Sequence, residues 1–215
     1  GEFYTERRSL LNYEDFPPQL IDALIASEDR KFYEHHGIDY GGIFRAFFRN
    51  LIRFRLAQGG STLTQQLAKV LFTNQEKTLD RKLFEFFCAR AIESKYSKKE
   101  ILEMYLNLIY MGHGIYGLET ASQFYFNKSA TNLTMGEAAA LVGIIPNPKA
   151  FSPVSDLPRF LERQHNVLLS LVAVNKISDE KVKTERVKFF RAWRIAARDS
   201  KQSAIGDFPD RLTGK

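Results

Sequence analysis

The strongest constraint on the fold of this chain of 215 residues is a helical spacing of apolar side chains that recurs along most of its length. Intervals of three and four residues are the period of one face of an α-helix. This period, or a helix start signal, occurs in segments 18–35, 41–56, 62–73, 79–95, 98–110, 115–126, 134–144 and 156–174. Only residues 1–11 have an extended pattern, and Pro148 and Pro153 mark an irregular stretch. The fold class is therefore predicted to be mainly α.

The composition is that of a folded domain with an excess of positive charge. Apolar residues make up 44% of the chain, which is enough for one core, in one or two lobes. The net charge of +6 favours anionic partners such as phosphates, anionic lipid or nucleic acid, without selecting among them. Cys88 is the only cysteine, and no cysteine or histidine spacing is typical of a zinc site. No apolar run reaches the roughly 18 residues of a membrane span, and we expect an excised domain because the sequence begins at Gly1.

The first candidate site is a pair of adjacent carboxylates, Glu28 and Asp29. In the predicted helix 18–35, Glu28 continues the apolar stripe that includes Leu24 and Ile25. Burial and a neighbouring like charge both disfavour the ionised form, so one carboxylate of the pair is expected to have a raised proton affinity. A general acid or base needs this property. A capping or ion-pair role, which is the commoner use of one helical carboxylate, also fits these residues.

The second candidate site lies at the start of the predicted helix 62–73. Two glycines precede it, and Thr62 with Gln65 forms a capping box. A helix N-terminus that follows glycines suits a phosphate group. Thr62, Gln66 and Lys69 fall at i, i+4 and i+7, so a hydroxyl, an amide and an ammonium share one face. An anion site and a well-capped helix with an exposed polar face both explain the pattern.

A third cluster combines two cations with a carboxylate. Arg81 and Glu85 share a helix face, and Lys82 is the neighbour of Arg81. Two cations and a carboxylate are therefore gathered on this part of the helix, although an ordinary surface ion pair also explains them.

The fourth candidate group contains sugar-binding residue types. Tyr105, Asn107 and Tyr116 could present hydroxyls and an amide to a sugar, although tyrosines at helical spacing are more often core residues.

Residues 42–56 predict a basic amphipathic helix, with phenylalanines on one side and arginines spaced by four on another. Such a helix lies in a membrane interface, packs against a partner or covers a core, and the pattern alone does not decide. The basic tail from Lys176 to Arg198, which contains Trp193, is either a docking surface or a solvated helix.

Taken together and in this order, these stretches resemble the signature of the family 51 peptidoglycan glycosyltransferases. The resemblance is carried by Glu28-Asp-x-x-Phe-x-x-His-x-Gly37, Gly60-Ser-Thr-x-x-Gln-Gln-Leu-x-Lys69, Arg81-Lys-x-x-Glu85, and Tyr105-x-Asn-x-x-Tyr-x-Gly112 leading into Tyr116-Gly117. Leu133 to Pro146 resembles the fifth motif of that family. The resemblance runs from about residue 3 to residue 174 and fades beyond residue 175.

The resemblance implies an activity and a fold. Members of this family polymerise lipid II into β-1,4-linked glycan strands with inversion, and they release undecaprenyl pyrophosphate during bacterial cell wall synthesis. The implied fold has a lysozyme-like head lobe and a smaller membrane-facing jaw lobe at about residues 38–60. The glycosyltransferase domain is expected at residues 1–175, and residues 176–215 are expected to form a basic helical extension or linker.

The same resemblance implies a role for each motif residue. Glu28 and Glu85 would be the catalytic residues. Glu28 would be the general base that deprotonates the acceptor hydroxyl, and Glu85 would lie near the leaving pyrophosphate, where it orients cations or a metal. By analogy with inverting glycosidases, the two carboxyl groups are expected to lie roughly 6.5 to 9.5 Å apart or more. The substrate-binding and site-shaping residues would be Asp29, Phe32, His35, Ser61, Thr62, Gln66, Lys69, Arg81, Lys82, Tyr105, Asn107 and Tyr116.

The implied partners are lipid II, the growing glycan strand and a membrane surface contacted by residues 42–56. The sequence leaves open whether the full-length protein is a monofunctional polymerase or also carries a transpeptidase domain. A divalent cation (Mg²⁺ or Mn²⁺) that bridges the pyrophosphate is expected, without an organic cofactor or nucleic acid. The expected location is the outer face of the bacterial inner membrane, with an N-terminal transmembrane anchor that precedes these residues and with sensitivity to moenomycin-type inhibitors. The alternatives are a lysozyme-like glycan-cleaving enzyme and an inactive membrane-bound scaffold of cell wall assembly.

Overall fold

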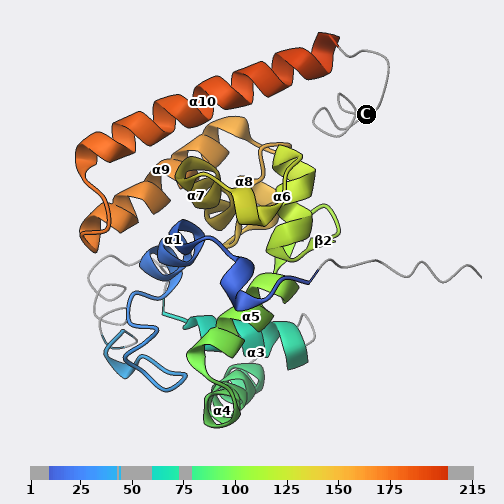
Figure 1. The fold of residues 1–215 in the computed structure, drawn as a ribbon. Coiled ribbons are helices and arrows are strands. Elements are labelled where there is room, and N and C mark those ends of the chain that lie inside the picture. Colours follow the sequence, from blue (N-terminus) through green and yellow to red (C-terminus); the bar gives the residue numbers. More distant parts are fainter. Residues whose placement is uncertain (1–9, 43, 45–59, 73–78, 203–215) are drawn as a thin grey trace, which may run out of the picture. The chain divides into compact units, whose positions relative to one another are not determined.

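The computed structural model describes residues 10–42, 44, 60–72 and 79–202, with Leu79 and residues 194–202 described by backbone alone (Figure 1). The described residues are mostly helical, which confirms the predicted mainly α class. The chain divides into two compact units. The first comprises Gly1–Asp15 and Glu28–Ile109, and the second comprises Phe16–Ser27 and Tyr110–Lys215.

The described part of the first unit is built on three helices. Helix α3 packs against both of the others, and its residues Leu63 and Leu67 are fully buried. A capping box between Ser97 and Glu100 fixes the start of one neighbour. The elements of this unit are the 3-10 turn η1 (Tyr13–Asp15), α3 (Leu63–Phe72), α4 (Leu79–Lys95) and α5 (Lys98–Leu108). The helices predicted at 62–73, 79–95 and 98–110 are therefore confirmed to within two residues.

Helix α1 (Pro18–Glu28) ends earlier than the apolar pattern predicts, since the predicted helix ran to residue 35. The carboxylate of Asp29 accepts hydrogen bonds from His35 Nε2 at 3.0 Å and from the Leu63 N–H at 2.9 Å. Residues 30–37 form turns and bends, and Gly37 has a φ of +87°. The prediction of one continuous helix through residue 35 is therefore wrong. The Asp29 carboxylate accepts hydrogen bonds from His35 and Leu63, and the chain turns after Glu28 instead of continuing as a helix.

The basic amphipathic helix predicted at 42–56 lies almost entirely outside the described residues, and so do most of residues 1–11. Residues 40–42 and 44 are helical, and Phe44 is exposed. In the part of the chain that the structure describes, none of the helices combines the length and the hydropathy of a membrane span.

In the residues that the structure describes, the second unit consists of helices and one small hairpin. Strands β1 (Tyr110–Gly112) and β2 (Ile115–Tyr116) are antiparallel, with Tyr110 opposite Tyr116. The sequence did not predict this hairpin, whose turn needs positive φ angles at Gly112, His113 and Gly114. The other elements, besides α1 up to Ser27, are α6 (Leu118–Phe126), the 3-10 turn η2 (Ala130–Asn132), α7 (Met135–Ile144), α8 (Pro148–Phe151), α9 (Leu157–Ala173) and α10 (Asp179–Gln202).

Helix α7 is the centre of this second unit. Its residues from Gly136 to Ile144 are buried, and it packs closely on α9. A Cβ atom at Gly143 would lie 3.1 Å from the Cβ of Arg163, so only glycine allows this approach without adjustment. Helix α10 packs on both α7 and α9 (Figure 1), with Val182 and Phe189 buried. The part of the basic tail from Val182 to Phe189 therefore belongs to a packed helix of the second unit.

Candidate active site

Three side chains of the first unit form a hydrogen-bonded line that ends at Glu28. Glu28 is half-buried at the end of α1, and its Oε2 accepts a hydrogen bond of 3.2 Å from Gln66 Nε2. The Tyr105 hydroxyl donates to Gln66 Oε1 at 2.8 Å. Burial raises the pKa of Tyr105 well above its usual value, and the nearby charge of Glu28 raises it further. The phenol therefore stays protonated and keeps donating to the Gln66 oxygen, while the Gln66 N–H donates to Glu28.

Asp29 does not face solvent. It is 7% exposed, and its two bonding partners, His35 and the Leu63 N–H, come from the following turn and from the start of α3. Phe32 is fully buried, with its ring edge-to-face against Tyr33 and His35. Asp29, Phe32 and His35 thus hold the turn that follows Glu28, and their contribution to substrate binding stays a prediction.

The predicted capping box at the start of α3 is present. The Gln65 N–H donates to Thr62 Oγ1 at 3.1 Å, and the Thr62 N–H donates to Gln65 Oε1 at 3.0 Å. The Thr62 hydroxyl itself donates to the Gly37 carbonyl at 2.6 Å, and Thr62 is 2% exposed. Thr62 therefore joins α3 to the turn after Glu28, while Lys69 is an exposed residue near the other end of the helix.

The second and third motifs meet at Lys82. Its Nζ lies 2.8 Å from Glu85 Oε2 and donates to Ser61 Oγ at 3.0 Å. Arg81 Nε lies 3.1 Å from Glu85 Oε1, which is ion-pair distance without hydrogen-bond geometry. Glu85 is 2% exposed, so this cluster is not the ordinary surface ion pair that the sequence left open. The half-exposed Lys82 ammonium is held beside Ser61 by a buried carboxylate.

Asn107 and Tyr116 lie in different surroundings. Asn107 Nδ2 donates to the Leu11 carbonyl at 2.8 Å, and its Oδ1 accepts from the Leu11 N–H at 3.1 Å, so the amide holds the N-terminal segment. Tyr116 belongs to β2 in the second unit, where it is 40% exposed and its ring centroid lies 5.1 Å from that of Tyr110.

Sequence reasoning missed two charged residues that contact the Glu28 turn, Glu93 and Lys98. Lys98 is the first residue of α5, and its Nζ donates to the His35 carbonyl and to Glu93 Oε1, each at 2.7 Å. The sequence did contain a signal for Lys98. A cation in the first turn of a helix interacts unfavourably with the helix dipole, so a lysine at this position suggests a specific tertiary contact.

The residues near Glu85 do not form a protein-built metal site. Across the described ranges, no group of three or more histidine, cysteine, aspartate or glutamate side chains is placed to hold a metal ion. The Glu85 carboxylate already has Lys82 and Arg81 within ion-pair distance. The donor set that the protein offers is therefore cationic, as an anionic ligand requires.

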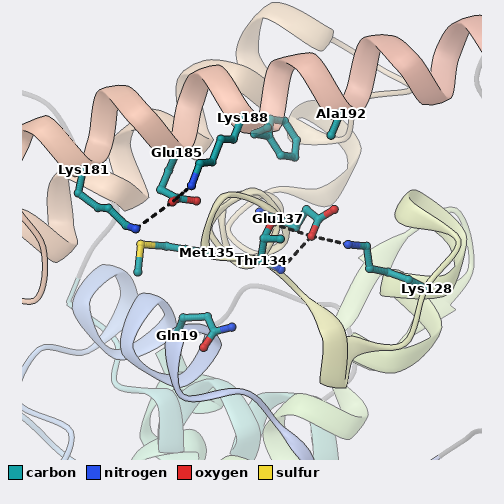
Figure 2. Close-up of a pocket in the computed structure, with 10 residues that line it drawn as sticks. Gln19, Lys128, Thr134, Met135, Glu137, Lys181, Glu185, Lys188 and Ala192 are labelled. Carbon is teal, nitrogen blue, oxygen red and sulfur yellow. Dashed lines mark hydrogen bonds and ion pairs between the residues drawn. The ribbon is translucent and has the colours of Figure 1, made fainter.

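A separate pocket of about 470 Å³ lies in the second unit (Figure 2). Lys128 is paired with Glu137 at 2.8 Å, and Lys181 and Lys188 lie 3.2 and 3.8 Å from Glu185. Each lysine thus has a carboxylate partner: Lys128 joins the segment after α6 to the start of α7, whereas the two pairs of Glu185 lie within α10. Gln19, Met135 and Phe189 line the same pocket.

Comparison with known proteins identifies relatives over most of the chain. Residues 1–172 match the family described as Transglycosylase. Penicillin-binding protein 1F of Bacillus subtilis is 44% identical over 168 residues, which are 78% of this chain and 24% of that protein. Penicillin-binding protein 1A of Escherichia coli is 39% identical over 192 residues, which are 89% of this chain and 23% of that protein. The chain thus spans about a quarter of the length of these curated relatives.

A crystal structure of penicillin-binding protein 1A from Haemophilus influenzae aligns with a TM-score of 0.48 at 24% identity, over 84% of this chain and 17% of that chain. The family match covers all the motifs from Glu28 to Pro146 in one stretch. It also agrees with the lysozyme-like, mainly α fold class expected from those motifs. The chain therefore belongs to the transglycosylase family.

Proposed function

We propose that this chain is a peptidoglycan glycosyltransferase that polymerises lipid II into β-1,4-linked glycan strands and releases undecaprenyl pyrophosphate. The family assignment supports this reaction class. One observation carries the assignment of residues: the same unit holds a half-buried carboxylate fixed by Gln66 and a separate ammonium fixed by a buried carboxylate beside Ser61. A base and a cation for a departing anion are the two groups that this reaction needs.

In this reaction, Glu28 takes the proton from the 4-hydroxyl of the acceptor sugar. The acceptor oxygen then bonds to the anomeric carbon of the donor while the bond from that carbon to pyrophosphate breaks. Because one displacement inverts the α configuration of the donor, the β linkage follows without a covalent sugar-enzyme intermediate. Gln66 orients the Glu28 carboxylate through its side-chain N–H.

The charge that develops on the leaving pyrophosphate is stabilised by Lys82 and Arg81. Glu85 does not touch the reacting atoms in this proposal; it is buried beneath these cations and sets their position. Lys69 adds positive charge on the same helix as Gln66. We further propose that a divalent cation, when present, is bound chiefly by the pyrophosphate oxygens, and that no organic cofactor takes part.

The proposed partners are lipid II, the growing strand and the outer surface of the bacterial inner membrane. Apolar side chains at the end of α3 and along α4 support a membrane-facing surface, because they are 50% to 66% exposed: Phe72, Leu83, Phe84 and Phe87. A transpeptidase domain in the same full-length protein belongs to the same proposal, which the length and the penicillin-binding names of the relatives support. Moenomycin-type inhibition is a further part of the proposal.

The proposed function is tested with the Glu28→Gln variant and lipid II in detergent. We expect loss of strand formation with an unchanged circular dichroism spectrum, whereas Glu34→Gln, at a side chain that is 66% exposed, should polymerise normally. Polymerisation by Glu28→Gln would contradict the assignment. Shortening of purified uncrosslinked strands by the wild-type chain would favour the lysozyme-like alternative, and a wild-type chain that leaves both lipid II and strands unchanged would favour the inactive scaffold.

A further inference from the structure

Lys98 is a cation that is held on three sides at the turn after Glu28. Its Nζ donates to the His35 carbonyl and to Glu93 Oε1, each at 2.7 Å, and lies 4.3 Å from the centre of the Phe32 ring. An ammonium has three N–H donors, so two hydrogen bonds and one cation–π contact use its bonding capacity. The side chain is 19% exposed, which is low for a lysine.

Glu93 extends this contact to α3. Its side chain is 5% exposed, and its Oε1 also accepts a hydrogen bond of 2.6 Å from the Thr64 hydroxyl. A carboxylate this deeply buried needs a compensating cation, which Lys98 supplies. The turn is also close to α4, because a Cβ atom at Gly37 would lie 2.9 Å from the Ala89 carbonyl oxygen and 3.2 Å from Glu93 Cγ.

The ion pair therefore connects the elements on both sides of the Glu28–Gln66 hydrogen bond. Lys98 holds the main chain of the turn that directly follows Glu28. Glu93 holds Thr64, which lies in the same helix turn as Gln66. Lys98 also begins the helix that carries Tyr105, the hydrogen-bond donor to Gln66.

We propose that Lys98 and Glu93 are positioning residues that fix Glu28 against Gln66 in the geometry for proton removal. This proposal rests on the proposed function of Glu28. Neither residue touches the reacting atoms, so their effect on the reaction runs through the Phe32–His35 turn and Thr64. Because a displacement of about 1 Å can lower a rate about 100-fold, loss of the Lys98 contact should lower kcat strongly while KM for lipid II changes little.

The test compares Lys98→Met, Lys98→Met/Glu93→Gln and the control Lys99→Met. Lys99 is the next residue and is 64% exposed; it pairs across the surface with Glu14 and lies 5.2 Å from the centre of the Tyr13 ring, so its variant should keep the wild-type kcat. We expect kcat of Lys98→Met to fall at least ~10-fold below that of Lys99→Met, with faster amide hydrogen exchange confined to residues 29–37. A kcat that falls less than this, or unchanged exchange in that turn, would overturn the proposal.

The double variant separates positioning from stability. Lys98→Met leaves the Glu93 charge buried without its cation, and Glu93→Gln removes that charge, so thermal stability should recover. The low kcat should persist, because the His35 carbonyl still lacks its ammonium donor. Recovery of kcat together with stability would show a merely structural role and would overturn the proposal. If the wild-type chain forms no strands from lipid II, the proposed function fails, and the exchange result alone decides whether Lys98 holds the turn.

Discussion

The Glu28 carboxylate accepts a hydrogen bond of 3.2 Å from the side-chain amide of Gln66. The same amide accepts from the Tyr105 hydroxyl at 2.8 Å through its oxygen. A flip of the amide would set its oxygen against the Glu28 carboxylate, so Glu28 fixes the direction in which Gln66 donates, and Tyr105 donates to the amide oxygen on the other side. This arrangement connects Glu28, at the end of α1, to α3 and α5. Gln66 lies between the other two side chains, so its substitution is the most direct test of the arrangement.

The variant Gln66→Leu should lower kcat for strand formation. A hydrogen bond to a charged group contributes about 1.5 to 3 kcal/mol, so we expect a fall of roughly 10- to 100-fold with little change in KM. Gln123→Leu, at an exposed amide on α6, is the matched control. Steady-state kinetics with lipid II measures both values, and equal activity of the two variants would contradict the role given to Gln66.

Replacement of Lys82 should slow the departure of pyrophosphate. In Lys82→Met, Glu85 and Ser61 lose their shared ammonium, and the loss of one charge-stabilising donor lowers kcat by about 100-fold or more. Lys183→Met, at a lysine that is 75% exposed on α10, should leave kcat unchanged. Single-turnover kinetics would report the step, and normal turnover by Lys82→Met would exclude Lys82 from the leaving-group site.

The raised pKa of Tyr105 predicts a pH dependence of stability at alkaline pH. The folded state keeps the phenol protonated, whereas the unfolded state ionises it above the ordinary tyrosine pKa of 10.0, so the contribution of Tyr105 is fully present below that pH and is lost as pH rises. The unfolding free energy of the wild type should therefore fall toward that of Tyr105→Phe above this pH. Urea denaturation at several alkaline pH values measures the difference, and Tyr33→Phe, at an exposed phenol, is the control. A constant difference between wild type and Tyr105→Phe would contradict the prediction.

Glu137 should contribute to the stability of the second unit. Its carboxylate accepts from the Thr134 N–H at 2.8 Å, from the Thr134 hydroxyl at 2.7 Å and from Lys128 at 2.8 Å (Figure 2). Glu137→Ala removes this cap of α7 and its ion pair, at an expected cost of about 1 to 3 kcal/mol. Chemical denaturation compares it with Glu180→Ala, an exposed position on α10 that should cost little. Equal stability of the two variants would rule out this role for Glu137.

The sequence by itself determined where several helices lie and which residue types form the site. Apolar periodicity and capping residues act within a few positions of one another, so they predicted α3, α4 and α5 and the capping box of Thr62 with Gln65. The order and spacing of the motifs also selected Glu28, Gln66 and Glu85 before any contact was known.

Only the tertiary structure decided where α1 ends and what each selected side chain does. Asp29 leaves the helix because its acceptors are satisfied by His35 and by the Leu63 N–H of a distant segment. The Asn107 amide likewise bonds to the main chain of Leu11, because a buried amide needs hydrogen-bond partners and the fold places Leu11 beside it. Long-range hydrogen bonds have no period along the chain, and this is why sequence patterns could nominate Glu28 but could not reveal that Lys98 holds the turn beside it.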